Sequence, residues 1–165
     1  MTLRLLLIRH AKSDQDAADL ADHERPLNAR GRRDAPRMGA WIADRGFAPD
    51  EVLCSYAQRT RETLDLMLPL WPAPPRVSHR ADLYHADPGA LLAALAGATG
   101  RTVALVGHNP GIGQLAETLA GQAPAHPRWT DFPTASVAVL AFEGATWSEI
   151  GEGEVLAYAI PADLA

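Results

Sequence analysis

Four residues in this chain have the types and positions needed to hold a phosphate group. Arg9 and His10 stand directly after one short apolar run, and His108 stands after another. Arg59 lies at the start of a segment with helical periodicity. The guanidinium of arginine is a planar, permanently charged group that matches phosphate oxygens, and a neutral imidazole is a competent nucleophile near pH 7. These residues predict a phosphate site at which a histidine takes up the phosphoryl group covalently.

The elements that must position these residues alternate between strands and helices. Strands are expected at residues 3–8, 51–55, 102–106, 136–142 and 155–160, and helices at 28–46, 58–68, 87–96 and 110–121. Pro36 predicts a kink in the first helix or a later start, and residues 69–75 form a proline-rich connector. This order predicts an α/β fold, a three-layer sandwich with a mainly parallel central sheet and helices on both faces. Ligands bind such sheets at the carboxyl ends of the strands, where the four residues fall.

The composition narrows the class of protein. A chain of 165 residues with 47% hydrophobic and 21% charged residues is typical of one globular domain. The net charge of -5 argues against nucleic acid as a partner, because such partners usually need a basic surface. One cysteine excludes an internal disulfide framework and fits a reducing compartment. No apolar stretch is long enough to span a membrane, so we expect a cytoplasmic protein without a membrane partner.

Three blocks of the sequence resemble a known family. "LLLIRHAKS" (5–13), "CSYAQRTRET" (54–63) and "ALVGHNPGI" (104–112) are similar to the three blocks of the histidine phosphatase superfamily, which has the phosphoglycerate mutase-like fold. The likeness is best to its short branch of bacterial phosphohistidine phosphatases. The blocks occur in order, each at the end of a predicted strand, and the chain length suits that branch. The resemblance implies a single histidine phosphatase domain over residues 1–165.

The resemblance also implies roles for the four residues. His10 would be the nucleophile that becomes phosphohistidine, and Arg9, Arg59 and His108 would bind the phosphoryl oxygens. No carboxylate cluster in the sequence suggests a metal site, so we expect neither a metal nor another cofactor. Ala11 stands where the family usually has glycine.

The stretch that supplies a glutamate general acid in many relatives reads "DLYHADPG" (82–89) here and contains no glutamate. His85 and Asp87 are the alternatives for that role. A phosphohistidine substrate needs an acid less, because imidazole leaves as a neutral molecule whose conjugate acid has a pKa of about 6.5.

These observations favour a metal-independent phosphatase that acts on phosphohistidine in a partner protein, with a role in signal transduction. The short connectors leave the site open enough for a phosphorylated protein such as a phosphohistidine domain, although a small phosphorylated substrate is an alternative. Further contacts to substrate are expected from a second set of residues: Lys12, Ser13, Ser55 and His85.

Other functions remain open from the sequence. The chain could be a small-molecule phosphatase or mutase of the same superfamily, or a phosphate-binding module without catalysis. The segment "GIGQLA" (111–116) fits a dinucleotide-binding pattern, but no acidic residue ends a strand at the expected distance. The segment from Cys54 to Arg59 resembles a cysteine-based phosphatase loop, but it is one residue too short.

A run of arginines precedes and enters the first predicted helix. A solvated helix face and a docking surface for an acidic partner protein are both compatible with it. The run consists of Arg25, Arg30, Arg32, Arg33 and Arg37.

Overall fold

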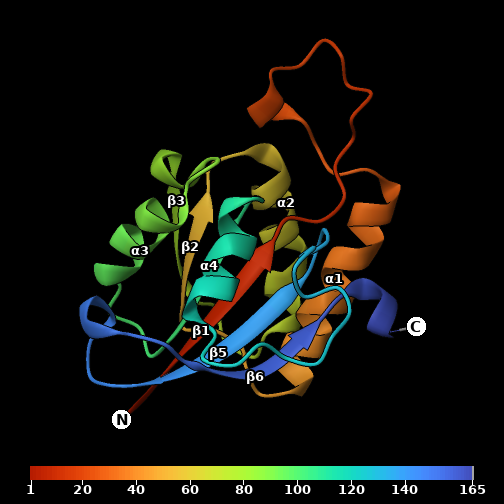
Figure 1. The fold of residues 1–165 in the computed structure, drawn as a ribbon. Helices are drawn as coiled ribbons and strands as arrows, with labels where there is room; N and C mark the ends of the chain where they lie inside the picture. The colour runs from red at the N-terminus through yellow and green to blue at the C-terminus, as the bar shows by residue number, and fades with distance from the viewer. Residues whose placement is uncertain (165) are drawn as a thin grey trace.

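A six-stranded sheet forms the centre of the protein in the computed structural model, which describes residues 1–164 (Figure 1). The strand order is β3-β2-β4-β1-β5-β6, and β5 alone runs opposite to the other five strands. The prediction of a mainly parallel sheet is therefore confirmed. The strands are β1 (Thr2–Arg9), β2 (Glu51–Ser55), β3 (Arg76–Arg80), β4 (Thr102–Gly107), β5 (Val137–Glu143) and β6 (Glu154–Ala159).

Helices cover both faces of this sheet, as predicted. Helices α1 (Ala29–Asp44) and α2 (Gln58–Met67) pack on one face, and α3 (Pro88–Ala96) and α4 (Gly111–Leu119) pack on the other (Figure 1). In β1, Leu5 and Leu7 belong to the core beneath α3 and α4. Leu6 and Ile8 belong to the core beneath α1 and α2. A strand with both faces buried is continuously apolar, which is why β1 was predictable. No helix within residues 1–164 is long and apolar enough to cross a membrane.

The edge strand β3 was not predicted. Val77 is its one apolar residue, and Ser78 and His79 are exposed. The strand pairs only with β2 and contributes little to either core, so it has none of the hydrophobic periodicity that identifies buried strands.

Helix α1 begins at Ala29, which excludes a later start, one of the two alternatives that Pro36 predicted. Asn28 caps it, with its side-chain oxygen accepting a hydrogen bond from the Gly31 amide at 2.9 Å. The helix continues through Pro36 because the buried face on both sides of the proline, including Ala35 and Met38, packs against the sheet. Packing thus outweighs the loss of one backbone hydrogen bond.

The glycines of "GIGQLA" serve close packing within the protein. A Cβ atom at Gly111 would collide with the carbonyl oxygen of Ala86. One at Gly113 would lie 3.0 Å from the side-chain oxygen of Asn109. The glycine pattern that resembles a dinucleotide motif therefore has a packing role. Gly111 allows the start of α4 to lie close to the loop that follows β3.

The register of the sheet brings the three sequence blocks together. Arg9 of β1 pairs with Gly107 of β4, and Cys54 of β2 pairs with Val106 of β4. The residues that follow these pairs, His10, Ser55 and His108, therefore emerge side by side at the carboxyl edge of the sheet. The long connection between β1 and α1 extends beyond this edge (Figure 1).

Candidate active site

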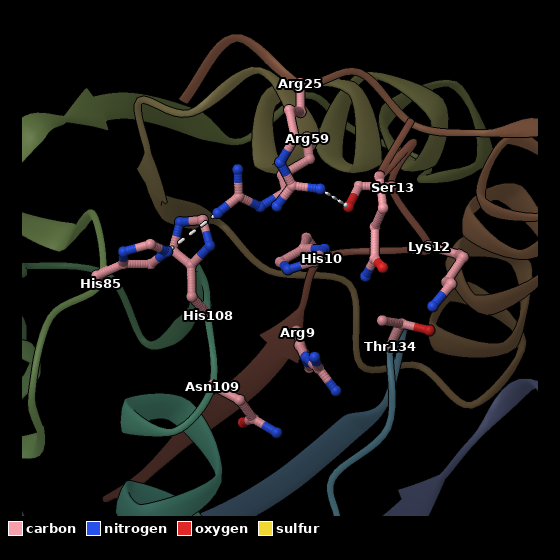
Figure 2. Close-up of a pocket in the computed structure, with 11 residues that line it drawn as sticks. Arg9, His10, Lys12, Ser13, Arg25, Arg59, His85, His108, Asn109 and Thr134 are labelled. Atoms are coloured by element: carbon pink, nitrogen blue, oxygen red, sulfur yellow. Dashed lines mark hydrogen bonds between the residues drawn. The ribbon is translucent and has the colours of Figure 1, made fainter. Parts of the chain in front are cut away.

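A polar pocket of about 190 Å³ opens at this edge of the sheet (Figure 2). Its lining includes three arginines, one lysine and three histidines, and contains no carboxylate among the described residues. No group of three or more His, Cys, Asp or Glu within residues 1–164 has the arrangement of a metal site. The pocket is lined by Arg9, His10, Lys12, Ser13, Gln15, Arg25, Arg59, His85, His108, Asn109 and Thr134.

His10 lies at the floor of the pocket with its side chain almost fully buried. Its Nδ1 is 2.7 Å from the carbonyl oxygen of Ala11, so Nδ1–H donates and Nε2 is left without a proton. The backbone of Ala11 is itself held by a hydrogen bond from its amide to Thr63 Oγ1 at 2.9 Å. Ala11 lies outside the positive-φ region, so alanine serves here where the family usually has glycine.

The environment of His10 keeps the imidazole neutral. Burial lowers its pKa to about 3, and the positive charges of Arg59, Arg9 and Arg25 act in the same direction, against the hydrogen bond to Ala11. The ring therefore presents an unprotonated Nε2 at neutral pH. Such a nitrogen can attack phosphorus.

Arg9 and Arg59 carry two of the three guanidinium groups of the pocket. Arg9 donates from Nη1 to the carbonyl oxygen of Phe132 at 3.1 Å. Arg59 donates from Nη1 to the backbone oxygen of Asp22 at 2.8 Å and from Nη2 to its carboxylate at 3.0 Å. Burial and the charge of Arg59 lower the pKa of Arg9. The Nε atoms of both arginines are buried and have no hydrogen-bond partner among the described residues.

His108 faces His10 across the pocket, with 5.3 Å between the ring centroids. Its Nε2 lies 2.8 Å from Ser55 Oγ, and its Nδ1 is the third buried nitrogen without a partner in residues 1–164. Burial, followed by the effects of His10 and Arg59, lowers its pKa to about 2. Unpaired buried polar nitrogens are costly, and the three residues that carry them all line one pocket, which favours an anion with several oxygens as its ligand.

Arg25 is a pocket residue that the sequence reasoning missed. It was grouped with the arginines of a solvated helix face, but it precedes α1 and lines the pocket. Arg25 donates from Nη1 to Ser13 Oγ at 2.9 Å and forms an ion pair of 3.0 Å with Asp22. In the sequence, only its position before Pro26, outside the predicted helix, separates Arg25 from the arginines of that helix. Arg30, Arg32 and Arg33 are exposed on α1, which is compatible with both a solvated helix face and a docking surface.

Asp22 is a second residue that the sequence did not predict for the site. It lies outside the pocket and binds both Arg59 and Arg25. Its carboxylate accepts hydrogen bonds from Tyr84, Arg59 and Arg25. The bond from Tyr84, with those from Arg59 and Arg25, holds the pKa of this carboxyl well below its usual range against the effect of burial. Nothing in the local sequence distinguishes Asp22 from the other acidic residues of this connection.

Three of the four additional residues expected to contact substrate lie in the pocket. Lys12 and Ser13 follow His10 along its wall, and His85 stands opposite them (Figure 2). Ser55 is fully buried behind His108, so the expected contact of Ser55 with substrate does not fit its position.

The two expected general acids are placed differently. Asp87 caps α3, where its Oδ1 accepts a hydrogen bond from the Ala90 amide at 2.8 Å, and it does not line the pocket. His85 lines the pocket, and its Nε2 lies 3.0 Å from Nη2 of Arg59. Because an arginine can only donate, His85 Nε2 accepts and is not the acid, and a neutral ring carries its proton on Nδ1.

Cys54 lies in the core and does not fit the role of a nucleophile. It is buried on β2, and its Sγ is directed at the carbonyl oxygen of Ser55 at 3.3 Å. Burial raises the pKa of this thiol to about 12, so the reactive thiolate does not form at neutral pH.

Comparisons with known proteins agree with this geometry. Residues 5–89 match the model of the histidine phosphatase superfamily (branch 1). An uncharacterised protein of Mycobacterium tuberculosis is 38% identical over 158 residues, which cover 88% of this chain and 93% of that protein.

Solved structures with a similar fold belong to proteins named as phosphohistidine phosphatases. A protein of Nakamurella multipartitia, provisionally named phosphohistidine phosphatase SixA, is 30% identical with a TM-score of 0.80. The match covers 98% of this chain and 97% of that chain. A protein of Agrobacterium tumefaciens with the same provisional name is 27% identical with a TM-score of 0.80, covering 96% and 98%.

The chain therefore belongs to the histidine phosphatase superfamily. Within it, the chain is a phosphohistidine phosphatase-like hydrolase of the short, SixA-like branch.

The position of Arg25 predicts a role in binding the substrate anion. Replacing Arg25 by alanine should raise KM for an aryl phosphate about 10-fold or more, because a charge-assisted hydrogen bond contributes about 1.5–3 kcal/mol. Steady-state kinetics measure this effect. Arg33→Ala, which removes an exposed arginine of α1, is the matched control and should leave KM unchanged. Equal KM values for the two variants would remove Arg25 from the site.

The lowered pKa values of the two histidines predict a stability that depends on pH. Folded His10 and His108 stay neutral at pH values where the unfolded chain protonates them, near pH 6.5 and below. The free energy of unfolding should therefore fall as the pH decreases from about 6.5, by up to ~1.4 kcal/mol per pH unit for each histidine.

Urea unfolding between pH 7 and pH 5 tests this dependence. His108→Gln should flatten the slope, whereas His79→Gln, at an exposed position, should change it far less. A slope that His108→Gln leaves intact would contradict the buried, neutral state of His108.

Proposed function

We propose that this enzyme removes the phosphoryl group from phosphohistidine in a partner protein, without a metal ion, through a covalent phosphohistidine on His10. The observation that carries this proposal is the chemistry of the pocket lining. It combines a neutral histidine nucleophile with three arginines and offers no carboxylic acid to protonate a leaving group. A substrate with an easy leaving group suits such a pocket best.

Phosphohistidine is a substrate of this kind. Its imidazole leaves as a neutral molecule once the other ring nitrogen is protonated by water, whereas a serine alkoxide needs a proton from an acid. The solved relatives from Nakamurella and Agrobacterium, named for activity on phosphohistidine, support the same substrate class.

The reaction proceeds in two balanced steps. Nε2 of His10 attacks phosphorus, the P–N bond to the substrate imidazole breaks, and the phosphoryl group is now bound to His10. A water molecule then attacks phosphorus, the bond to His10 Nε2 breaks, and inorganic phosphate (H2PO4⁻) leaves with the oxygen and both protons of the water, while His10 returns to the neutral ring with its proton on Nδ1. Arg9, Arg59 and His108 would stabilise the phosphoryl oxygens in both transition states, since all three residues line the pocket.

The cationic side chains supply the charge that a metal ion supplies in other phosphatases. Arg9, Arg25, Arg59 and Lys12 all line a pocket of about 190 Å³. Four fixed positive groups offset the charge of a phosphoryl group and hold its oxygens in place. The proposal therefore includes activity that does not depend on added metal.

A pair of peptides of matched sequence tests the substrate class. One carries phosphohistidine and the other phosphoserine at the same position, and both are incubated with the enzyme in EDTA. The phosphohistidine peptide should be hydrolysed with a kcat/KM about 100-fold higher or more, because a missing general acid costs about 10²–10⁴ in rate with an alkoxide leaving group.

Two variants test the nucleophile in the same assay. His10→Ala should abolish hydrolysis, and Cys54→Ser should retain it. Equal rates on both peptides would contradict the substrate class, loss of activity in EDTA would contradict metal independence, and full activity of His10→Ala would contradict the mechanism.

A further inference from the structure

We propose that Ser55 is a positioning residue that fixes His108 in the tautomer with the proton on Nδ1, so that His108 donates a hydrogen bond to the phosphoryl group. The proposal rests on the proposed function for the identity of that group. It gives a role to a buried serine that does not itself reach the pocket.

The sheet places Ser55 and His108 in contact. Ser55 is the last residue of β2, and His108 follows the last residue of the neighbouring strand β4. Ser55 is completely buried, and its Oγ lies 2.8 Å from Nε2 of His108. Such a short separation in a buried place means that one of the two atoms donates a proton to the other.

The surroundings of Ser55 indicate which atom donates. The amide of Ala57 donates to Ser55 Oγ at 3.4 Å, so this oxygen already acts as an acceptor. Within residues 1–164, His108 Nε2 is its only other hydrogen-bond partner. If Nε2–H donated to Ser55, the buried hydroxyl proton would have no acceptor. The arrangement in which the Ser55 hydroxyl donates to Nε2 satisfies both groups.

The other ring nitrogen of His108 leads to the same tautomer. Nδ1 is buried without a partner in the described chain, and Figure 2 shows it on the edge of the ring that faces His10. If Nε2 accepts from Ser55, a neutral ring carries its proton on Nδ1. An N–H on the side of the ring that faces His10 (Figure 2) attracts an oxygen of a phosphoryl group held at His10, whereas a lone pair at this position would repel it.

A neutral ring with a fixed tautomer has a functional consequence. Arg59 and His85 border His108 in the pocket, and burial together with these neighbours lowers the pKa of His108 to about 2. His108 therefore acts as a neutral donor that keeps its proton throughout the reaction. Its hydrogen bond is available over the whole pH range in which His10 is unprotonated.

Nitrogen NMR of protein labelled with ¹⁵N-histidine tests this assignment directly. Long-range proton–nitrogen correlations distinguish a protonated ring nitrogen from an unprotonated one. In the wild type, His108 Nδ1 should be protonated and Nε2 unprotonated, and addition of inorganic phosphate should shift the Nδ1 resonance. Ser55→Ala should give a mixture of tautomers, and Ser55→Thr, which keeps a hydroxyl, should restore the single one.

Kinetics on an aryl phosphate complete the test. Ser55→Ala should lower kcat about 10-fold or more with a smaller change in KM, since the lost hydrogen bond acts mainly on the transition state. Ser55→Thr should recover most of the loss. Tyr56→Phe, which changes the next residue and leaves the Ser55–His108 contact in place, is the matched control and should keep both the tautomer and kcat.

The outcomes separate this proposal from the proposed function. A wild-type His108 protonated on Nε2, or a Ser55→Ala variant that keeps the Nδ1 proton and full kcat, overturns the role of Ser55. An inactive wild type whose His108 carries the Nδ1 proton supports the role of Ser55 in setting the tautomer and overturns the proposed function alone.

Discussion

The repulsion between Arg9 and Arg59 is the physical constraint on which the rest of the site depends. Both guanidinium groups are held at one pocket, and the charge of Arg59 lowers the pKa of Arg9. Backbone oxygens of Phe132 and Asp22 and the carboxylate of Asp22 bind their outer nitrogens. All of these partners lie away from the Nε atoms, which remain unpaired. The pocket is thereby left with a concentrated positive charge and free donors, which are the requirements for binding a phosphoryl group.

Burial and the same positive field keep the two histidines neutral. Burial disfavours a charged imidazole, and a protonated ring would also add to the repulsion, so His10 and His108 stay neutral, and each is held by one defined hydrogen bond. At His10 the carbonyl oxygen of Ala11 accepts a hydrogen bond from Nδ1–H, which leaves Nε2 unprotonated as a nucleophile. At His108 the hydroxyl of Ser55 would leave Nδ1–H as a donor. Two rings of the same chemical type thus take opposite roles because their partners differ, one an acceptor and the other a donor.

The sheet and the four central site residues could be predicted because they follow from short-range patterns. Continuous apolar strands identify a parallel sheet, and a parallel sheet brings its strand ends together, so Arg9, His10 and His108 had to be neighbours. The missed features depend on tertiary contacts. Strand β3 is an exposed edge with little apolar content, and Asp22 and Arg25 reach the site from a connection without periodicity. Ser55 was expected at the substrate, but only the register of β2 against β4 shows that it lies behind His108.

Trapping the phosphorylated enzyme tests the central claim most directly, namely that His10 carries the phosphoryl group. The enzyme is mixed with a phosphohistidine peptide and quenched in alkali during turnover, which preserves a phosphorus–nitrogen bond, and its peptides are examined by mass spectrometry. The account predicts one phosphorylated site, at His10, that is lost on brief treatment with acid. Phosphate on another residue, or steady turnover with no phosphorylated enzyme, would contradict it.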